Sequence, residues 1–178
     1  MSPQQFAHQK GIWDLAAPVL ENDKFYTWSA SSLINNDPSK PRLHHYGKGG
    51  LRGHTFEVID LCAFNTELYP TLDKIVLFLA ALYHDIGKIW DYEERDGEWY
   101  SVDHKKEIHH VSRSALVWHE TCIKHPNPYA DKVLHCILSH HGRQEWGSPV
   151  APRSKEAWLL HLCDAISARM DDCERIKL

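Results

Sequence analysis

The sequence has no hydrophobic run long enough to cross a bilayer. Its longest apolar run is Ile75–Tyr83, whereas a membrane-spanning helix needs about 20 apolar residues. Residues 1–5 also lack the basic and then apolar pattern of a secretory signal. We therefore expect a cytoplasmic protein that has no membrane partner.

Closely spaced cysteine pairs are absent too. The five cysteines are odd in number and widely spaced, and none belongs to a CxxC pair. A zinc knuckle or a disulfide framework is therefore not expected. We expect reduced thiols packed within helical segments, at Cys62, Cys122, Cys136, Cys163 and Cys173.

An excess of basic charge is the third absence. The formal net charge is −4, which argues against a broad basic face for duplex DNA or long RNA. A chain of 178 residues fits one domain with a full core, or one domain with a short appendage. The sequence does not indicate an oligomeric state.

The sequence does contain helical periodicity from residue 51 onward. Apolar residues at helical spacing predict helices over about 51–68, 72–84, 105–124, 130–141 and 155–174. Thr71 is expected to cap the second of these helices. Before this region, residues 13–20 suggest a short helix that Pro18 breaks.

One segment departs from that periodicity. Residues 90–103 place an Asp-Gly turn between aromatic, partly alternating arms. This pattern is typical of a β-hairpin. The expected fold class is therefore all-α, with one small β-hairpin near residues 90–103.

A histidine and an aspartate end the apolar run, where His84 and Asp85 follow Leu82-Tyr83 directly. A buried carboxylate is stable only when it is paired, hydrogen-bonded or bound to a metal. Imidazole and carboxylate groups suit first-row divalent ions. Taken alone, however, the dipeptide is explained more simply by a His–Asp hydrogen bond at a helix end.

The other predicted helices each offer polar side chains from an apolar face. His54 lies in the first turn of one helix, and Asp164 falls on the apolar stripe of the last. The remaining candidates are two adjacent pairs, His109-His110 and His140-His141. A single histidine is more often structural than a ligand, but the whole set favours a metal centre.

The order of these residues, His … His-Asp … His … His-His … Asp, resembles that of the HD-domain superfamily of metal-dependent phosphohydrolases. Residues 42–175 further resemble the catalytic domain of the YhaM-type 3′→5′ exoribonucleases. The motifs that carry this resemblance are His44-His45-Tyr46, Gly49-Gly50-Leu51, His54-Thr55, His84-Asp85-Ile86-Gly87-Lys88, Leu138-Ser139-His140-His141-Gly142, Glu145-Trp146-Gly147-Ser148-Pro149, Glu156-Ala157 and Asp164.

The resemblance implies a helical HD fold with a phosphodiesterase site for two divalent metal ions. Its ligand set divides between the ions, with His54, His84, Asp85 and Asp164 for one, and His110 and His140 with a bridging Asp85 for the other, His141 lying close by. His109 competes with His110 for its place. The resemblance favours manganese, and the ligand types also allow iron, cobalt, nickel or zinc.

The expected reaction is attack by a metal-activated hydroxide on a phosphodiester, and Asp85 is the central catalytic residue. Lys88 would neutralise charge on the phosphoryl oxygens, and Glu145 would contact the substrate or a water. Both are also explained as ordinary solvated residues. Candidate phosphate contacts are Lys48, Arg52 and Arg143, which scattered surface bases explain equally well.

Residues 42–178 are expected to form the HD catalytic domain and residues 1–41 an appendage packed on it. That appendage is too short for the OB-type domain that holds RNA in those exonucleases. The expected substrate is a nucleotide or a short single-stranded nucleic acid, cleaved in the manner of a 3′→5′ exonuclease. Three alternatives stay open: a hydrolase of nucleotides or small phosphate esters, a di-iron oxygenase of the HD type, and a binding module without catalysis.

Overall fold

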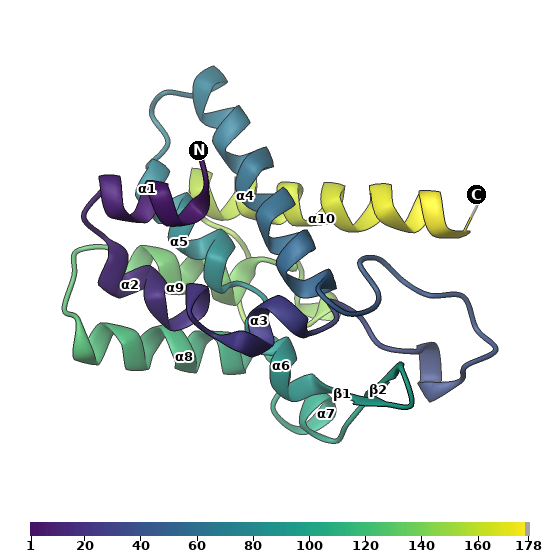
Figure 1. Ribbon diagram of the computed structural model, residues 1–178. Helices are drawn as coiled ribbons and strands as arrows, with labels where there is room; N and C mark the ends of the chain where they lie inside the picture. The colour runs from purple at the N-terminus through teal and green to yellow at the C-terminus, as the bar shows by residue number, and fades with distance from the viewer. Residues whose placement is uncertain (177–178) are drawn as a thin grey trace.

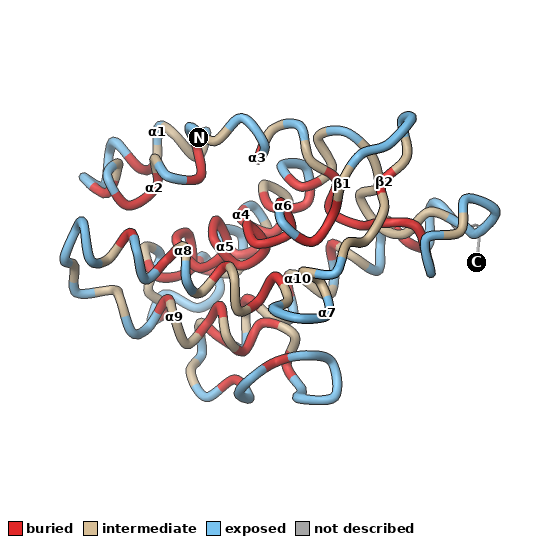
Figure 2. Tube along the Cα trace, turned by 90° about the horizontal axis from the view of Figure 1, so that it is seen from below, coloured by how far each residue is buried: buried red, intermediate tan, exposed pale blue. Residues whose placement is uncertain are grey.

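Helix α5 (Lys74–Tyr83) is the centre of this computed structural model, which describes residues 1–176 (Figure 1). Its residues from Val76 to Tyr83 are all buried (Figure 2). The longer helices pack around it: α2 (Trp13–Leu20), α4 (Gly50–Leu68), α8 (His110–Lys124), α9 (Ala130–Ser139) and α10 (Lys155–Ile176). A helix that is apolar on all sides is stable only when its neighbours cover it.

The first residues of the chain are part of this core. Helices α1 (Pro3–Gln9), α2 and α3 (Asp23–Thr27) contribute Ala7, Val19 and Phe25 in turn, and all three residues are fully buried. The expectation that Pro18 breaks α2 is wrong, because the helix continues through it to Leu20. Pro18, the sixth of the eight residues of α2, lacks only its own backbone N–H donor, and the buried Val19 holds the helix in the core.

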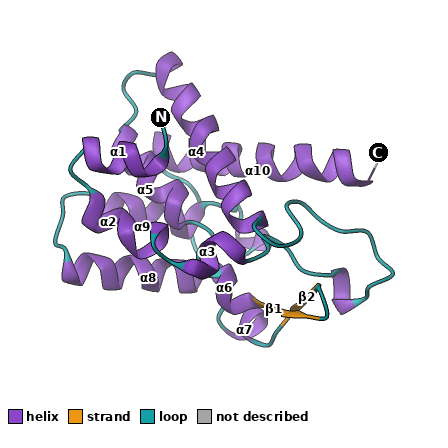
Figure 3. Ribbon diagram, viewed as in Figure 1, coloured by secondary structure: helices purple, strands orange, loops and turns teal. Residues whose placement is uncertain are grey.

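The predicted β-hairpin is present, beside a fold that is otherwise helical (Figure 3). Helix α6 (Lys88–Asp91) leads into β1 (Tyr92–Arg95), which pairs antiparallel with β2 (Glu98–Ser101). Asp96 and Gly97 form the turn, and both have positive φ angles, of 51° and 80°. Such a turn matches the twist of a two-stranded ribbon. The expected all-α fold with one hairpin is therefore confirmed.

The helix predicted over 105–124 is divided in two. Helix α7 (His104–Glu107) ends before Ile108, and α8 begins at His110. His109 lies between them with a φ of +69°, which an α-helix does not permit. Ile108 is consequently 40% exposed instead of buried.

Two smaller expectations also change. Thr71 does not cap α5; the carboxylate of Asp73 does, accepting hydrogen bonds from the backbone N–H groups of Ile75 and Val76 at 3.0 and 3.1 Å. All five cysteines are free thiols as expected, but Cys173 is exposed and not packed. Within residues 1–176, no helix combines the length and apolar character that a bilayer crossing requires.

The cap of α5 gives a test of the fold. Asp73→Ala should lower the free energy of unfolding by about 1 kcal/mol, because two N–H groups lose their acceptor. For a chain of this size the melting temperature should fall by roughly 2–4 °C. Thr71→Ala is the matched control. The Thr71 hydroxyl accepts a hydrogen bond from Lys155 at the solvent-exposed surface and does not contact the N–H groups of α5. Equal melting temperatures for the two variants would contradict the assigned cap.

Candidate metal centre

Two groups of His and Asp side chains converge where the helices around α5 meet. Within each group, one ligand atom per residue lies within 4.8 Å of all the others. Group A is His54, His84, Asp85 and Asp164, and group B is His110, His140 and His141. Group A draws on α4, the end of α5 and α10, whereas group B draws on the start of α8 and the end of α9.

The carboxylate of Asp85 faces both groups. Its Oδ2 lies 3.3 Å from Nε2 of His54 and 3.4 Å from Nε2 of His84. Its Oδ1 lies 3.4 Å from Nε2 of His110 and 3.8 Å from Nε2 of His140. One acidic side chain can therefore reach both groups at once, as a bridging ligand must.

Gly87 allows this approach. A Cβ at this position would lie 2.2 Å from the carbonyl oxygen of His110, which is closer than two atoms can pack. The N–H of Gly87 also donates to Ser114 Oγ of α8 at 2.9 Å. The turn after α5 consequently packs directly on the start of α8, which brings Asp85 next to His110.

Backbone carbonyls fix the tautomer of three of the imidazoles. Each Nδ1 donates to a carbonyl oxygen: His84 to Ala81 at 2.7 Å, His140 to Ile137 at 2.6 Å, and His141 to Trp146 at 2.7 Å. A carbonyl oxygen can only accept. Each Nδ1 therefore carries the proton, and each Nε2 presents its lone pair to the site, the arrangement that metal-binding histidines require.

Asp91 plays the same part for His110, and sequence analysis missed it. Its Oδ2 accepts from both the backbone N–H and Nδ1 of His110, each at 3.1 Å. Its Oδ1 lies 2.7 Å from Nδ1 of His104. Asp91 is fully buried at the end of α6. An aspartate between aromatic residues was a signal, but it lay in the segment assigned to the hairpin.

His54 is oriented through two further residues that sequence analysis missed. Its Nδ1 lies 3.0 Å from Ser167 Oγ. That hydroxyl donates to Glu57 Oε2 at 2.9 Å, so its oxygen is free to accept from His54. His45 also contacts this pair, 3.1 Å from Ser167 and 3.2 Å from Glu57.

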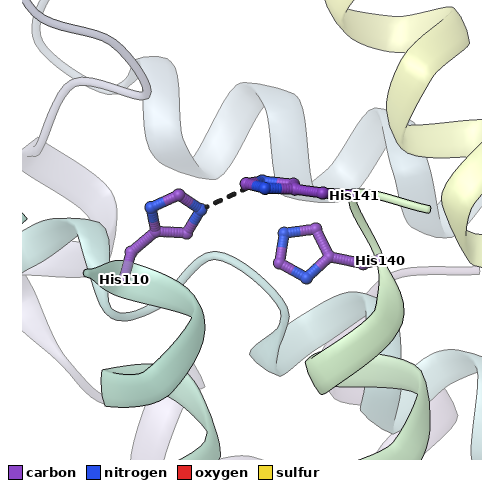
Figure 4. A group of neighbouring side chains, drawn as sticks. All are labelled: His110, His140 and His141. Atoms are coloured by element: carbon purple, nitrogen blue, oxygen red, sulfur yellow. Dashed lines mark hydrogen bonds between the residues drawn. The ribbon is translucent and has the colours of Figure 1, made fainter. Parts of the chain in front are cut away.

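The donor set fits a cation. In group B, Nε2 of His110 lies 3.3 Å from Nε2 of His141 (Figure 4). Among residues 1–176, the buried Nε2 of His140 has no hydrogen-bond partner. Burial holds the pKa values of His110 and His140 well below the ordinary value, so both imidazoles are neutral. The Nε2 lone pairs of neutral imidazoles repel one another when they face the same point. A cation at that point accepts them and removes the repulsion.

Group A needs positive charge as well. Burial alone would lower the pKa of His54, but its hydrogen bonds to Asp164 and Asp85 raise it to about 9. Without a metal ion, the His54 imidazolium and the Lys88 ammonium, which pairs with Asp85, together balance the two acids. A divalent cation would take over that charge and release the proton.

Lys88 is buried. The simpler explanation of this residue, an ordinary solvated lysine, is therefore excluded. Its Nζ lies 2.6 Å from Asp85 Oδ2. Burial would raise the pKa of Asp85, but Lys88 and then His84 outweigh it and hold that pKa well below its ordinary value. Lys88 also lines the cleft that opens onto both groups.

Four other predicted residues lie away from the two groups. They are exposed, and none of them is among the described residues that line the cleft: Glu145, Lys48, Arg52 and Arg143. Arg52 precedes His54 by two positions, which turns its side chain roughly 200° around α4. Arg143 lies over the ring of Trp146, 5.0 Å from its centroid. His109 was expected to compete with His110 as a ligand. It belongs to neither of the two groups that the described residues form.

The cleft has a volume of about 1110 Å³. Besides members of both groups and His44 of the His44-His45-Tyr46 motif, it is lined by basic and polar side chains that the sequence did not single out, including Ser31, Lys105, Lys106 and Arg169. A volume of this size accommodates more than a single small ligand.

Comparisons with known proteins agree with this geometry. The family model described as HD domain matches residues 51–169. The chain is 34% identical over 168 residues to the 3′-5′ exoribonuclease YhaM of Shouchella clausii (strain KSM-K16), which covers 92% of this chain and 52% of that protein. It is 32% identical over 168 residues to the 3′-5′ exoribonuclease YhaM of Bacillus subtilis (strain 168), covering 92% and 53%.

The chain thus spans about half the length of these two relatives. No solved structure matches it. The HD model, in contrast, covers more than half of this chain and includes every member of groups A and B. The chain therefore belongs to the HD-domain family.

Proposed function

We propose that this chain is a metal-dependent phosphohydrolase that cleaves nucleotidyl phosphodiesters from the 3′ end of short RNA or single-stranded DNA. The observation that carries the proposal is the Asp85 carboxylate, which belongs to group A, lies 3.4 Å from His110 of group B and lines an open cleft. The named activity of the two relatives, 3′-5′ exoribonuclease, supports the same reaction.

In this proposal group A would hold one divalent ion and group B a second, and Asp85 would serve as a ligand to both. Manganese is the favoured ion, and iron, cobalt, nickel or zinc suit the same ligands. Such ions supply positive charge for phosphate oxygens and lower the pKa of a coordinated water toward neutrality. Asp85 and Asp164 offset part of that charge, and the neutral imidazoles offset none of it. The site therefore stays positive and attracts an anionic substrate.

The chain's own residues prepare the site. The carbonyls of Ala81, Ile137 and Trp146 hold the proton on Nδ1 of their histidine partners, so that the Nε2 lone pair of each of these three rings is available to a metal ion. Lys88 stays fixed by Asp85 at the cleft wall. Its ammonium is placed to stabilise charge that develops on the phosphoryl oxygens.

A second candidate is a hydrolase of free nucleotides or small phosphate esters. The exposed positions of Lys48, Arg52 and Arg143 favour it, because these bases cannot guide a strand within the cleft. The net charge of −4 points the same way. A free nucleotide needs fewer phosphate contacts than a strand does.

A substrate panel separates the candidates. With Mn²⁺, the protein should shorten a short single-stranded oligonucleotide from its 3′ end and release nucleoside monophosphates. Mono- and triphosphates of nucleosides should stay intact under the same conditions. Release of phosphate from the free nucleotides alone would favour the second candidate, and oxygen consumption with bound iron would favour an HD-type oxygenase.

The bridging role of Asp85 predicts a joint loss of metal and activity. Asp85→Asn should bind fewer ions per chain, measured by elemental analysis after desalting, and its turnover should fall by at least about a hundredfold. Asp60→Asn is the control, because Asp60 is exposed on α4. Full turnover by the Asp85 variant would exclude a bridging role.

Asp91 predicts an effect on metal affinity from outside the ligand set. Removing its carboxylate frees the ring of His110, so Asp91→Ala should weaken Mn²⁺ binding by about 10- to 100-fold in calorimetric titration. Asp91→Asn keeps the side-chain volume and should show a smaller loss. Unchanged affinity in both folded variants would show that Asp91 does not prepare His110 for metal binding.

A further inference from the structure

One wall of the cleft carries a buried hydroxyl that has nothing to bind. Ser31 is 3% exposed and lines the cleft, and within the described residues its Oγ has no hydrogen-bond partner. Its backbone is satisfied, because the Ser29 hydroxyl accepts from Ser31 N–H and donates to Ser31 C=O. A buried hydroxyl without a partner is costly, so this side chain is poised for a ligand group.

The same wall carries an ammonium group that no acid balances. Lys105 lines the cleft, and across residues 1–176 no carboxylate lies within 4.0 Å of its Nζ. Of the three other lysine and arginine side chains that line the cleft, Lys88 pairs with Asp85 at 2.6 Å and Arg169 with Asp172 at 3.5 Å, whereas Lys106 is exposed. Burial, together with the nearby Lys88 charge, lowers the pKa of Lys105.

Hydrogen bonds connect Lys105, through Ser101 and Ser32, to the loop that carries Ser31. Lys105 Nζ donates to Ser101 Oγ at 3.4 Å, and that hydroxyl lies 2.6 Å from Ser32 Oγ, next to Ser31. Asn36 exchanges two hydrogen bonds with the backbone of Ser101, at 2.8 and 3.0 Å. The loop that carries Ser31 is thereby fixed on β2 before any ligand arrives.

We propose that Ser31 and Lys105 form a second phosphate subsite, which holds the phosphate on the 5′ side of the one that is cleaved. The inference rests on the proposed function and gives the substrate class of that site, namely nucleotide chains with at least two phosphates. An ammonium and a hydroxyl that line the same cleft provide donors for phosphate oxygens, and the bonds from the ammonium are charge-assisted. Neither residue belongs to groups A or B, so the scissile phosphate does not need them.

Two dinucleotides that differ by one phosphate test the subsite. The ligand pTpT carries a 5′-phosphate in addition to its internucleotide phosphate, and TpT carries only the latter. With Mn²⁺, the full chain should cleave pTpT with a kcat/KM at least about tenfold higher, through a lower KM. Calorimetric binding in EDTA should show the same preference without hydrolysis.

Two variants should remove the preference for pTpT and leave TpT unchanged. They are Lys105→Gln and Ser31→Ala, and the control Lys132→Gln changes an exposed lysine of α9. Ser31→Ala should keep or raise the melting temperature, because it deletes an unpartnered buried hydroxyl. Loss of pTpT and TpT cleavage to the same extent, or no loss in either variant, would overturn the subsite.

Failure of the proposed function and failure of the phosphate subsite give different results in this experiment. Preferential binding of pTpT in EDTA without any hydrolysis in Mn²⁺ would refute the proposed function and keep the subsite. Hydrolysis of both dinucleotides with equal kcat/KM and equal binding by the wild-type chain would keep the proposed function and refute the subsite.

Discussion

The position of the Asp85 carboxylate between two sets of imidazole nitrogens constrains the rest of the molecule. Its Oδ2 faces His54 and His84, and its Oδ1 faces His110 and His140. The burial of α5 delivers this acid to the centre of the fold. Each helix that covers α5 near this end then adds a polar side chain to the same place, so the core and the candidate centre form together.

The surroundings of the histidines explain why the site is ready before any ion arrives. Carbonyl groups, the Asp91 carboxylate and the Ser167 hydroxyl each engage an Nδ1 and so orient the rings. Burial keeps His110 and His140 neutral. The negative charge of the site lies on the two acids of group A. In the metal-free chain, the positive charges of His54 and Lys88 balance it.

The sequence predicted the parts that follow from periodicity and from unusual residue types. The helices around α5, the Asp-Gly hairpin and the His and Asp members of both groups are of this kind. It did not predict Asp91, whose partners are distant in the chain, or Ser31, which lies in a loop without a repeating pattern. It also placed Arg52 near the site by its number alone, although two residues along a helix turn a side chain to the opposite face.

The central claim is that divalent cations hold groups A and B together around Asp85. Anomalous diffraction from crystals grown with Mn²⁺ tests it most directly, because the ions themselves are located. The account predicts two peaks, one inside each group, with the Asp85 carboxylate between them. Peaks at other places, or an Mn²⁺-saturated protein with neither group occupied, would contradict it.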